Sequence, residues 1–169
     1  MSLRLVFRKQ GYTLIEITTV VFLIGLLILV TIPRFREGIL TDGLKLTVRK
    51  IVGTAKNLRN VAVLDQKDYL LCFDLESNRL WTMLLTASPE ERYQGEKNAF
   101  QLPDDVKILD IVHPGMDKDT TGYATIRFFK KGYVQPTVIH LGAKDGREFS
   151  VILSPFLWKV KVYDRYVDM

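Results

Sequence analysis

The first hydrophobic feature of the chain is a continuous apolar run near its amino terminus. From Tyr12 to Ile32, Glu16 is the only charged side chain. About 21 residues at about 1.5 Å per residue give a helix of about 31 Å, which matches the hydrocarbon core of a bilayer. The pattern predicts a membrane-spanning helix over residues 12–33.

Glu16 lies about one helical turn after Tyr12, away from the centre of this run. A carboxylate at the centre of a membrane helix costs roughly 2.5 to 3.5 kcal/mol. Near the helix start, unpaired backbone N–H groups and the positive end of the helix dipole offset part of that cost. If the chain were cut after Gly11, the new ammonium group of Tyr12 would lie one turn from Glu16, or close to Glu16 of a neighbouring copy. The position of this acid therefore indicates a role in pairing with an amino-terminal ammonium group.

Beyond Pro33 the sequence becomes polar but keeps a helical period. Between the two patterns stand Pro33, Gly38 and Gly43, which all weaken a helix. We expect one long helix with a bendable middle, with Gly25 and Pro33 as candidate bend positions, and with residues 34–64 lying against a soluble domain. The apolar stripe of this second half recurs at steps of three and four: Leu44, Val48, Ile51, Ala55, Leu58 and Ala62.

From Tyr69 onward the period changes to two, which indicates antiparallel strands. The residues between 88 and 95 are charged and are expected to form a loop, whereas residues 76–78 and 145–146 are expected to be hairpin turns. The fold class is therefore α+β, with a long amino-terminal helix packed on an antiparallel β-sandwich or curled sheet over residues 65–169. The expected strands cover residues 69–75, 79–85, 106–112, 123–129, 137–141, 147–153 and 158–162.

Composition changes this picture in two ways. The 169 residues suffice for a membrane helix and one soluble domain, and they carry a net charge of +5 from 24 basic and 19 acidic residues. Removal of Arg4, Arg8 and Lys9 with a leader of residues 1–11 leaves 21 basic against 19 acidic residues, or +2. The leader charge fits the positive-inside rule, with a cytoplasmic amino terminus. The single cysteine, Cys72, is expected to be a buried strand residue, in preference to a reactive thiol.

Three interpretations compete for the apolar run. A cleaved secretory signal would need small residues after the run, where the chain has Pro33 and Arg34. A plain signal anchor is the second. The third is a processing site placed before the run, between Gly11 and Tyr12, which leaves the helix on the mature protein.

The basic leader, Gly11, the sequence Tyr12-Thr13-Leu14-Ile15-Glu16 and an apolar helix with Pro33 near its end resemble type IV prepilins and pseudopilins. This resemblance implies that a prepilin peptidase cuts on the cytoplasmic face after Gly11 and methylates the new terminus at Tyr12, where most members have Phe. It also implies that Glu16 neutralises the terminal amine of an adjacent subunit during filament assembly.

The later part of the chain is similar to the GspH/FimT class of minor pseudopilins and minor pilins, in strand count and in the turn at Phe128–Gly132. It departs from that class at Leu157-Trp158, where the class usually has a Thr-Gly pair. The resemblance implies a minor pseudopilin of a type II secretion system. Its partners would be the prepilin peptidase, other major and minor pseudopilins, the inner-membrane assembly platform and the lipid bilayer.

The implied location is the inner membrane, single-pass with a periplasmic domain, and then the periplasmic pseudopilus. A minor pilin of a type IV pilus or DNA-uptake system is the alternative. A signal-anchored periplasmic binding module that never polymerises is a further rival.

Few other residues point to chemistry. His113 and His140 are expected to be structural, because neither has a cysteine or carboxylate at metal-ligand spacing. We expect no catalytic residue, cofactor, metal or nucleic-acid partner, since no nucleophile or phosphate-loop motif occurs. An acidic group that could supply calcium ligands is expected to be a solvated loop instead: Asp104, Asp105, Asp110, Asp117 and Asp119. The cations considered for DNA contact are interspersed with acids: Lys130, Lys131, Arg147, Lys159 and Arg165.

Overall fold

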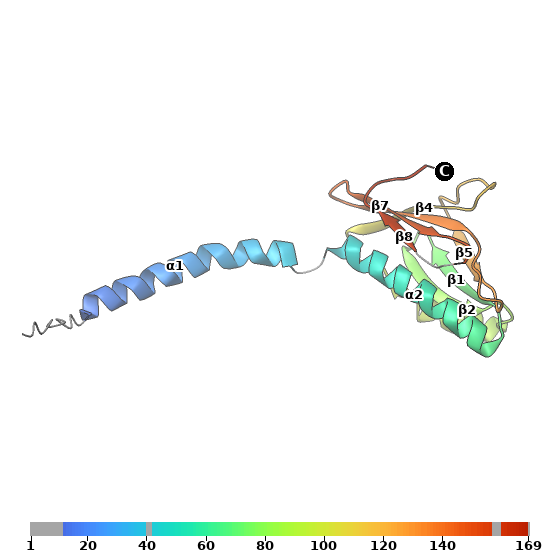
Figure 1. Ribbon diagram of the computed structural model, residues 1–169, viewed down its shortest axis with the longest axis horizontal. Coiled ribbons are helices and arrows are strands. Elements are labelled where there is room, and N and C mark those ends of the chain that lie inside the picture. The colour runs from blue at the N-terminus through green and yellow to red at the C-terminus, as the bar shows by residue number, and fades with distance from the viewer. Residues whose placement is uncertain (1–11, 40–41, 157–159, 169) are drawn as a thin grey trace, which may run out of the picture. The chain divides into compact units, whose positions relative to one another are not determined.

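The computed structural model describes residues 12–39, 42–156 and 160–168, with the backbone alone for residues 28–39 (Figure 1). The chain divides into two compact units, Met1–Thr41 and Asp42–Met169. The predicted leader with Gly11, the Leu157-Trp158 pair and Lys159 lie outside the described residues.

The first unit contains helix α1, Leu14–Ile39. The helix continues through Gly25 and Pro33, so neither residue ends it, and a bend at either position stays a prediction. Within the part of the chain that is described, no helix meets the combined length and hydropathy of a bilayer span.

The second unit begins with helix α2, Gly43–Asp65. All six residues of the predicted apolar stripe are buried, which confirms the amphipathic helix. The sequence pattern predicted one long helix, whereas the structure has α1 and α2 as separate helices. Asp42 caps the start of α2 by accepting a hydrogen bond from the Lys45 N–H at 3.4 Å, and this cap favours a new helix start there.

Two four-stranded antiparallel sheets follow, in the orders β3-β2-β1-β5 and β4-β6-β7-β8. The predicted turns are confirmed: Asn78, between β1 and β2, has φ of 50°, and Gly146, between β6 and β7, has φ of 85°. The strands are β1 Tyr69–Asp74, β2 Arg79–Leu84, β3 Phe100–Gln101, β4 Val106–Val112, β5 Tyr123–Phe128, β6 Thr137–Ala143, β7 Glu148–Leu153 and β8 Lys161–Tyr163.

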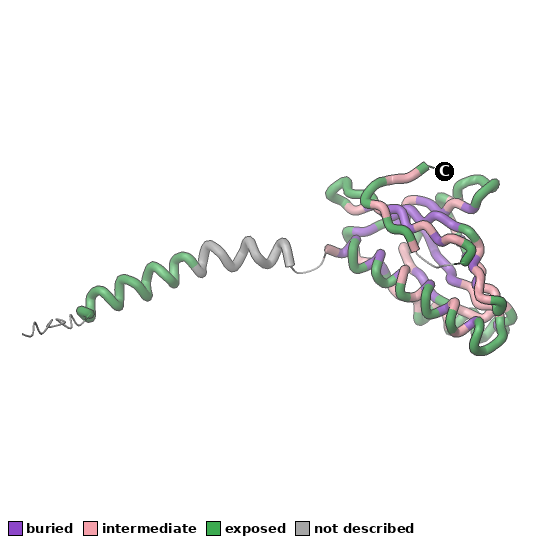
Figure 2. Tube along the Cα trace, viewed as in Figure 1, coloured by how far each residue is buried: buried purple, intermediate pink, exposed green. Residues whose placement is uncertain are grey.

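The core lies between α2 and the inner faces of both sheets (Figure 2). Phe73 and Phe128 come from one sheet, Ile139 and Leu141 from the other, and Ile51 from α2; all are fully buried. Residues Thr137 to Gly142 of β6 are buried on both faces of their sheet. The domain is thus α+β with one shared core, as the sequence predicted.

Two local predictions were wrong. The expected loop at residues 88–95 contains helix α3, Pro89–Lys97, which begins with a capping box between Ser88 and Glu91 and buries no residue. The strand predicted over residues 158–162 is wrong in its bounds, because Val160 lies outside it and β8 is a three-residue edge strand, Lys161–Tyr163, in which Val162 is exposed.

Candidate functional site

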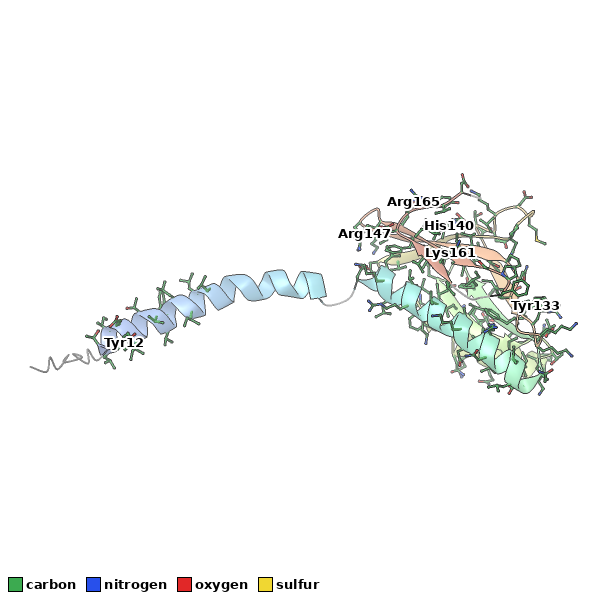
Figure 3. The ribbon with its side chains drawn as sticks, in the orientation of Figure 1. Tyr12, Tyr133, His140, Arg147, Lys161 and Arg165 are labelled. Atoms are coloured by element: carbon green, nitrogen blue, oxygen red, sulfur yellow. The ribbon has the colours of Figure 1, made fainter. Side chains whose placement is uncertain are left out.

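The first turn of α1 presents a carboxylate at the start of an apolar helix. Thr13 precedes the helix and accepts the Glu16 N–H through its backbone oxygen at 3.1 Å and through Oγ1 at 3.3 Å. This cap fixes the first turn, so Glu16 occupies the position where helix N–H groups favour a negative charge. Tyr12 lies just before this turn and is exposed (Figure 3).

The surface of α1 around Glu16 is apolar on every side. Val20 to Ile24 are five consecutive residues with exposed fractions of 49–68%, so they point in all directions around the helix axis. Side chains of this size each gain roughly 1.5–3 kcal/mol when they leave water. A helix that is hydrophobic all round is buried in lipid or in a larger protein core.

The hydroxyl groups of two threonines in α1 form hydrogen bonds to the backbone of the same helix. The Thr18 hydroxyl lies 2.9 Å from the backbone oxygen of Ile15, and the Thr19 hydroxyl lies 2.7 Å from the same oxygen. A hydroxyl that bonds to its own helix can enter an apolar environment without losing a hydrogen bond. Among the described side chains of α1 from Leu14 to Leu26, Glu16 is therefore the one group that an apolar environment would leave without compensation.

This arrangement can pair the helix with a cation. A buried carboxylate needs an opposite charge or several hydrogen bonds. An ammonium group at the amino terminus of a neighbouring helix would satisfy that need while the apolar surfaces pack together. Tyr12 lies just before α1 and Glu16 lies in its first turn, while Gly11 lies outside the described residues.

A second cluster, which the sequence did not reveal, lies on the outer face of the sheet β4-β6-β7-β8. Register pairs Asp110 of β4 with His140 of β6, and the His140 Nδ1 lies 2.5 Å from Asp110 Oδ1. The Tyr166 ring stacks on His140 at 3.8 Å, and its hydroxyl donates to Asp110 at 2.9 Å. The other His140 nitrogen, Nε2, faces the backbone oxygen of Val167 at 3.1 Å. Both ring nitrogens face acceptors, so the ring satisfies both contacts when both nitrogens carry hydrogen.

The carboxyl-terminal residues cover this cluster. Ser150 of β7 donates to the backbone oxygen of Arg165 at 2.7 Å and accepts the Val167 N–H at 3.0 Å. Asp110, His140 and Ser150 are the residue types of a nucleophilic triad, but His140 Nε2 contacts Val167 in place of the Ser150 hydroxyl. The cluster therefore anchors the chain end, in agreement with the predicted structural role of His140.

His113 also has a structural environment. It is buried, and its Nδ1 lies 3.1 Å from the Thr137 hydroxyl. Within the described ranges, no three His, Cys, Asp or Glu side chains come together in a way that could hold a metal ion. Asp110 was expected in a solvated acidic loop, but it is a buried residue of β4 that contacts His140.

Cys72 is buried in β1, as the sequence predicted. Burial raises the pKa of its thiol to about 12. The neutral thiol is a weak nucleophile, so a reactive role is excluded at neutral pH.

One of the cations considered for DNA contact, Arg147, forms ion pairs within the domain. Arg147 donates to Asp42 at 2.7 Å and to Asp145 at 2.7 Å. The Arg147 contact lowers the pKa of Asp42 to about 2. Figure 3 shows Arg147 and Arg165 on the side of the domain that carries β7. Lys130 contributes its backbone N–H to Asp68, at 2.8 Å.

Comparison with known proteins identifies the kind of fold. No protein-family model matches the sequence, and no curated protein matches it. Among solved structures, the minor pseudopilin EpsH from the Type 2 Secretion System of Vibrio cholerae matches with a TM-score of 0.52 and 15% identity, over 73% of this chain and 98% of that one. A crystal structure of EpsH from the same system gives a TM-score of 0.49 and 16% identity, over 68% of this chain and 95% of that one. At this identity the likeness is one of fold, and the fold is pseudopilin-like.

Proposed function

We propose that the protein is a minor pseudopilin, a structural subunit of the periplasmic pseudopilus of a type II secretion system. The observation that carries this proposal is α1, whose described side chains from Leu14 to Leu26 are apolar on all sides and include one charged group, Glu16, in the first turn. The pseudopilin-like fold of the second unit supports it.

In this proposal residues 12–33 first reside in the inner membrane, with the domain in the periplasm. A prepilin peptidase cuts after Gly11 and methylates the amine of Tyr12. The assembly platform then transfers the helix from lipid to the filament core, where the apolar surface stays buried. Because both environments are apolar, this transfer does not require α1 to be hydrated.

Glu16 sets the axial alignment of neighbouring subunits in the proposed filament. Its carboxylate pairs with the amine of Tyr12 of an adjacent subunit, and an unpaired charge in that core would cost several kcal/mol. The side chain therefore favours an axial position at which each carboxylate meets an amine. The role of the domain is to contact other pseudopilins, and this role needs no catalytic group.

The test separates processing from assembly. The full chain is co-expressed with a prepilin peptidase, and intact mass is measured. We expect a loss corresponding to residues 1–11 and the addition of one methyl group. An uncut chain, or a cut at another bond, would overturn the processing step.

Assembly is then measured by cross-linking to the other pseudopilins and by secretion of a type II substrate. Glu16→Gln should leave cleavage intact but abolish assembly and secretion, because the neutral amide cannot neutralise the amine. Thr19→Val is the matched control, since the Thr19 hydroxyl is already bonded within α1. Normal assembly of the Glu16→Gln protein would contradict the proposal.

A further inference from the structure

A groove of about 580 Å³ runs along one side of the second unit, between α2 and the edge of the sheet formed by β2 and β3. Arg49, Lys50 and Gly53 line it from α2, and Trp81 and Phe100 line it from the strands. Gly95 and Asn98, from the end of α3 and its C-cap, close its far side. All these residues belong to one compact unit, so the groove is a property of the domain itself.

The groove is positively charged. Its lining includes the cations Arg49 and Lys50 and no acid. Lys50 lies over the Phe100 ring at 5.2 Å, and in the described part of the chain neither cation has a carboxylate partner. By contrast, Arg127 and Arg147 each form ion pairs with an aspartate of their own domain. The groove therefore offers two charges to an external anion.

Gly53 provides an independent observation. It lies in the interior of α2 and is exposed, and a Cβ placed on it would meet no heavy atom within 4 Å. A glycine in a helix interior costs roughly 0.5–1 kcal/mol relative to alanine. At Gly95, on the facing wall, a Cβ would lie in van der Waals contact with Trp81, at 3.4 Å. At Gly53 no such contact exists with the described residues of the domain, and the missing side chain leaves room in the groove wall for the backbone of another chain.

The remaining lining suits a peptide. Trp81 and Phe100 give an apolar floor, while Thr54, Asn57 and Asn98 add hydroxyl and amide groups at the rim. Such a mixture of an apolar floor and a few polar groups is typical of peptide recognition. Two cations are too few for strong binding of a nucleic acid backbone, which depends on many phosphate contacts.

We propose that this groove binds an extended, acidic segment of a neighbouring subunit, with a carboxylate between Arg49 and Lys50 and the peptide backbone against Gly53. The identity of the neighbour as another pseudopilin rests on the proposed function, whereas the preference for an acidic peptide rests on the groove alone. Charge attraction would select the segment, and the apolar floor would retain it.

The chemistry is tested with the purified full-length chain in detergent micelles. The probe is a fluorescein-labelled extended peptide of alternating Glu and Leu, compared by anisotropy with the same peptide carrying Gln. We expect at least tenfold tighter binding of the Glu peptide, weakening as salt is raised. Equal binding of both peptides would overturn the proposal. Competition by phosphatidylglycerol vesicles with no peptide preference would also overturn it, in favour of a lipid surface.

Variants place the binding in the groove. Arg49→Glu combined with Lys50→Glu should reduce affinity at least tenfold, whereas Lys107→Glu with Lys131→Glu makes the same charge change at exposed residues outside the groove and should have a much smaller effect. Gly53→Phe should block the groove, and Gly53→Ala should weaken binding by a smaller factor. Thermal melting verifies that each variant folds. Equal loss in both charge pairs, or full binding by folded Gly53→Phe protein, would refute the assignment.

A photoreactive residue in place of Asn57 identifies the natural segment in cells that secrete, with Thr125 on β5 as the control position. We expect a cross-link from position 57 to an Asp- or Glu-rich peptide of another subunit, located by mass spectrometry and absent in the Arg49→Glu/Lys50→Glu protein. A cross-link that persists in that variant would contradict the proposal. Processing after Gly11, measured in the same cells, reports on the proposed function separately.

Discussion

The buried pair of Asp110 and His140 predicts a large and asymmetric response to mutation. Asp110→Leu would leave the His140 Nδ1–H without its acceptor at a site where the His140 side chain is 2% exposed. The Tyr166 O–H would also lose its acceptor, although the Tyr166 oxygen would still accept from Lys118 Nζ at 3.0 Å. Removal of one partner of a buried pair costs about 3–5 kcal/mol, so we expect a loss of that size. Most of this cost arises from the buried His140 ring, whose Nδ1–H would have no acceptor.

The double variant Asp110→Leu/His140→Leu should be much less harmful. Replacement of both partners by apolar groups removes the buried carboxylate and imidazole together, and such exchanges are often neutral. The Tyr166 hydroxyl and the Val167 oxygen also lose a contact, but both belong to half-buried residues that water can reach. We therefore expect the double variant to recover at least about 2 kcal/mol relative to Asp110→Leu. Asp110→Asn is the conservative control, since its amide oxygen can still accept one hydrogen bond.

Urea unfolding of residues 42–169, which form a separate unit, gives the free energies for this cycle. Each kcal/mol also lowers Tm by about 4 °C in a domain of this size. Amide hydrogen exchange at Val167, whose N–H donates to Ser150, reports locally on the chain end. If Asp110→Leu costs less than about 1 kcal/mol, or if the double variant loses the sum of both singles, then Asp110 and His140 do not stabilise the domain as a coupled buried pair.

Four further outcomes are expected. The backbone N–H of Lys130 lowers the pKa of Asp68 below its usual 3.8, so its contribution is complete above that pH and is lost as pH falls through the lowered value. The urea midpoints of wild type and Asp68→Asn should therefore converge in acid, and a constant difference between pH 2 and 5 would contradict this. Cys72 should resist a disulfide reagent at neutral pH in the folded protein and react once unfolded, because burial raises its pKa to about 12; rapid labelling of the native protein would refute this. Gly132→Ala should destabilise by about 1–2 kcal/mol in urea, because Gly132 has φ of 86°, whereas Gly53→Ala should stabilise by up to about 1 kcal/mol.

Local periodicity carried most of the fold prediction. The α2 stripe and the strands were visible because residues at fixed spacing share one buried face. Helix α3 was missed because it buries no residue and so has no apolar period. Its one signal was the capping pattern of Ser88 and Glu91, with Pro89 between them, in a stretch that charge alone suggested was a loop.

The candidate sites also differ in whether local sequence is enough to predict them. Tyr12 and Glu16 are neighbours in sequence, so the motif could be identified without knowledge of the fold. Asp110 and His140 are joined by the pairing of β4 with β6, and a sequence does not state which strands become neighbours. The groove is equally non-local, because Arg49 and Trp81 come from different elements.

The cover that residues 165–167 place over β6 has a consequence for protein engineering. His140 and Ser150 take these contacts from residues 27 and 15 positions later in the chain. A chain truncated before Arg165 would therefore expose both side chains to water. An insertion next to Arg165 would disturb the same contacts, whereas one placed in an exposed turn would leave them intact.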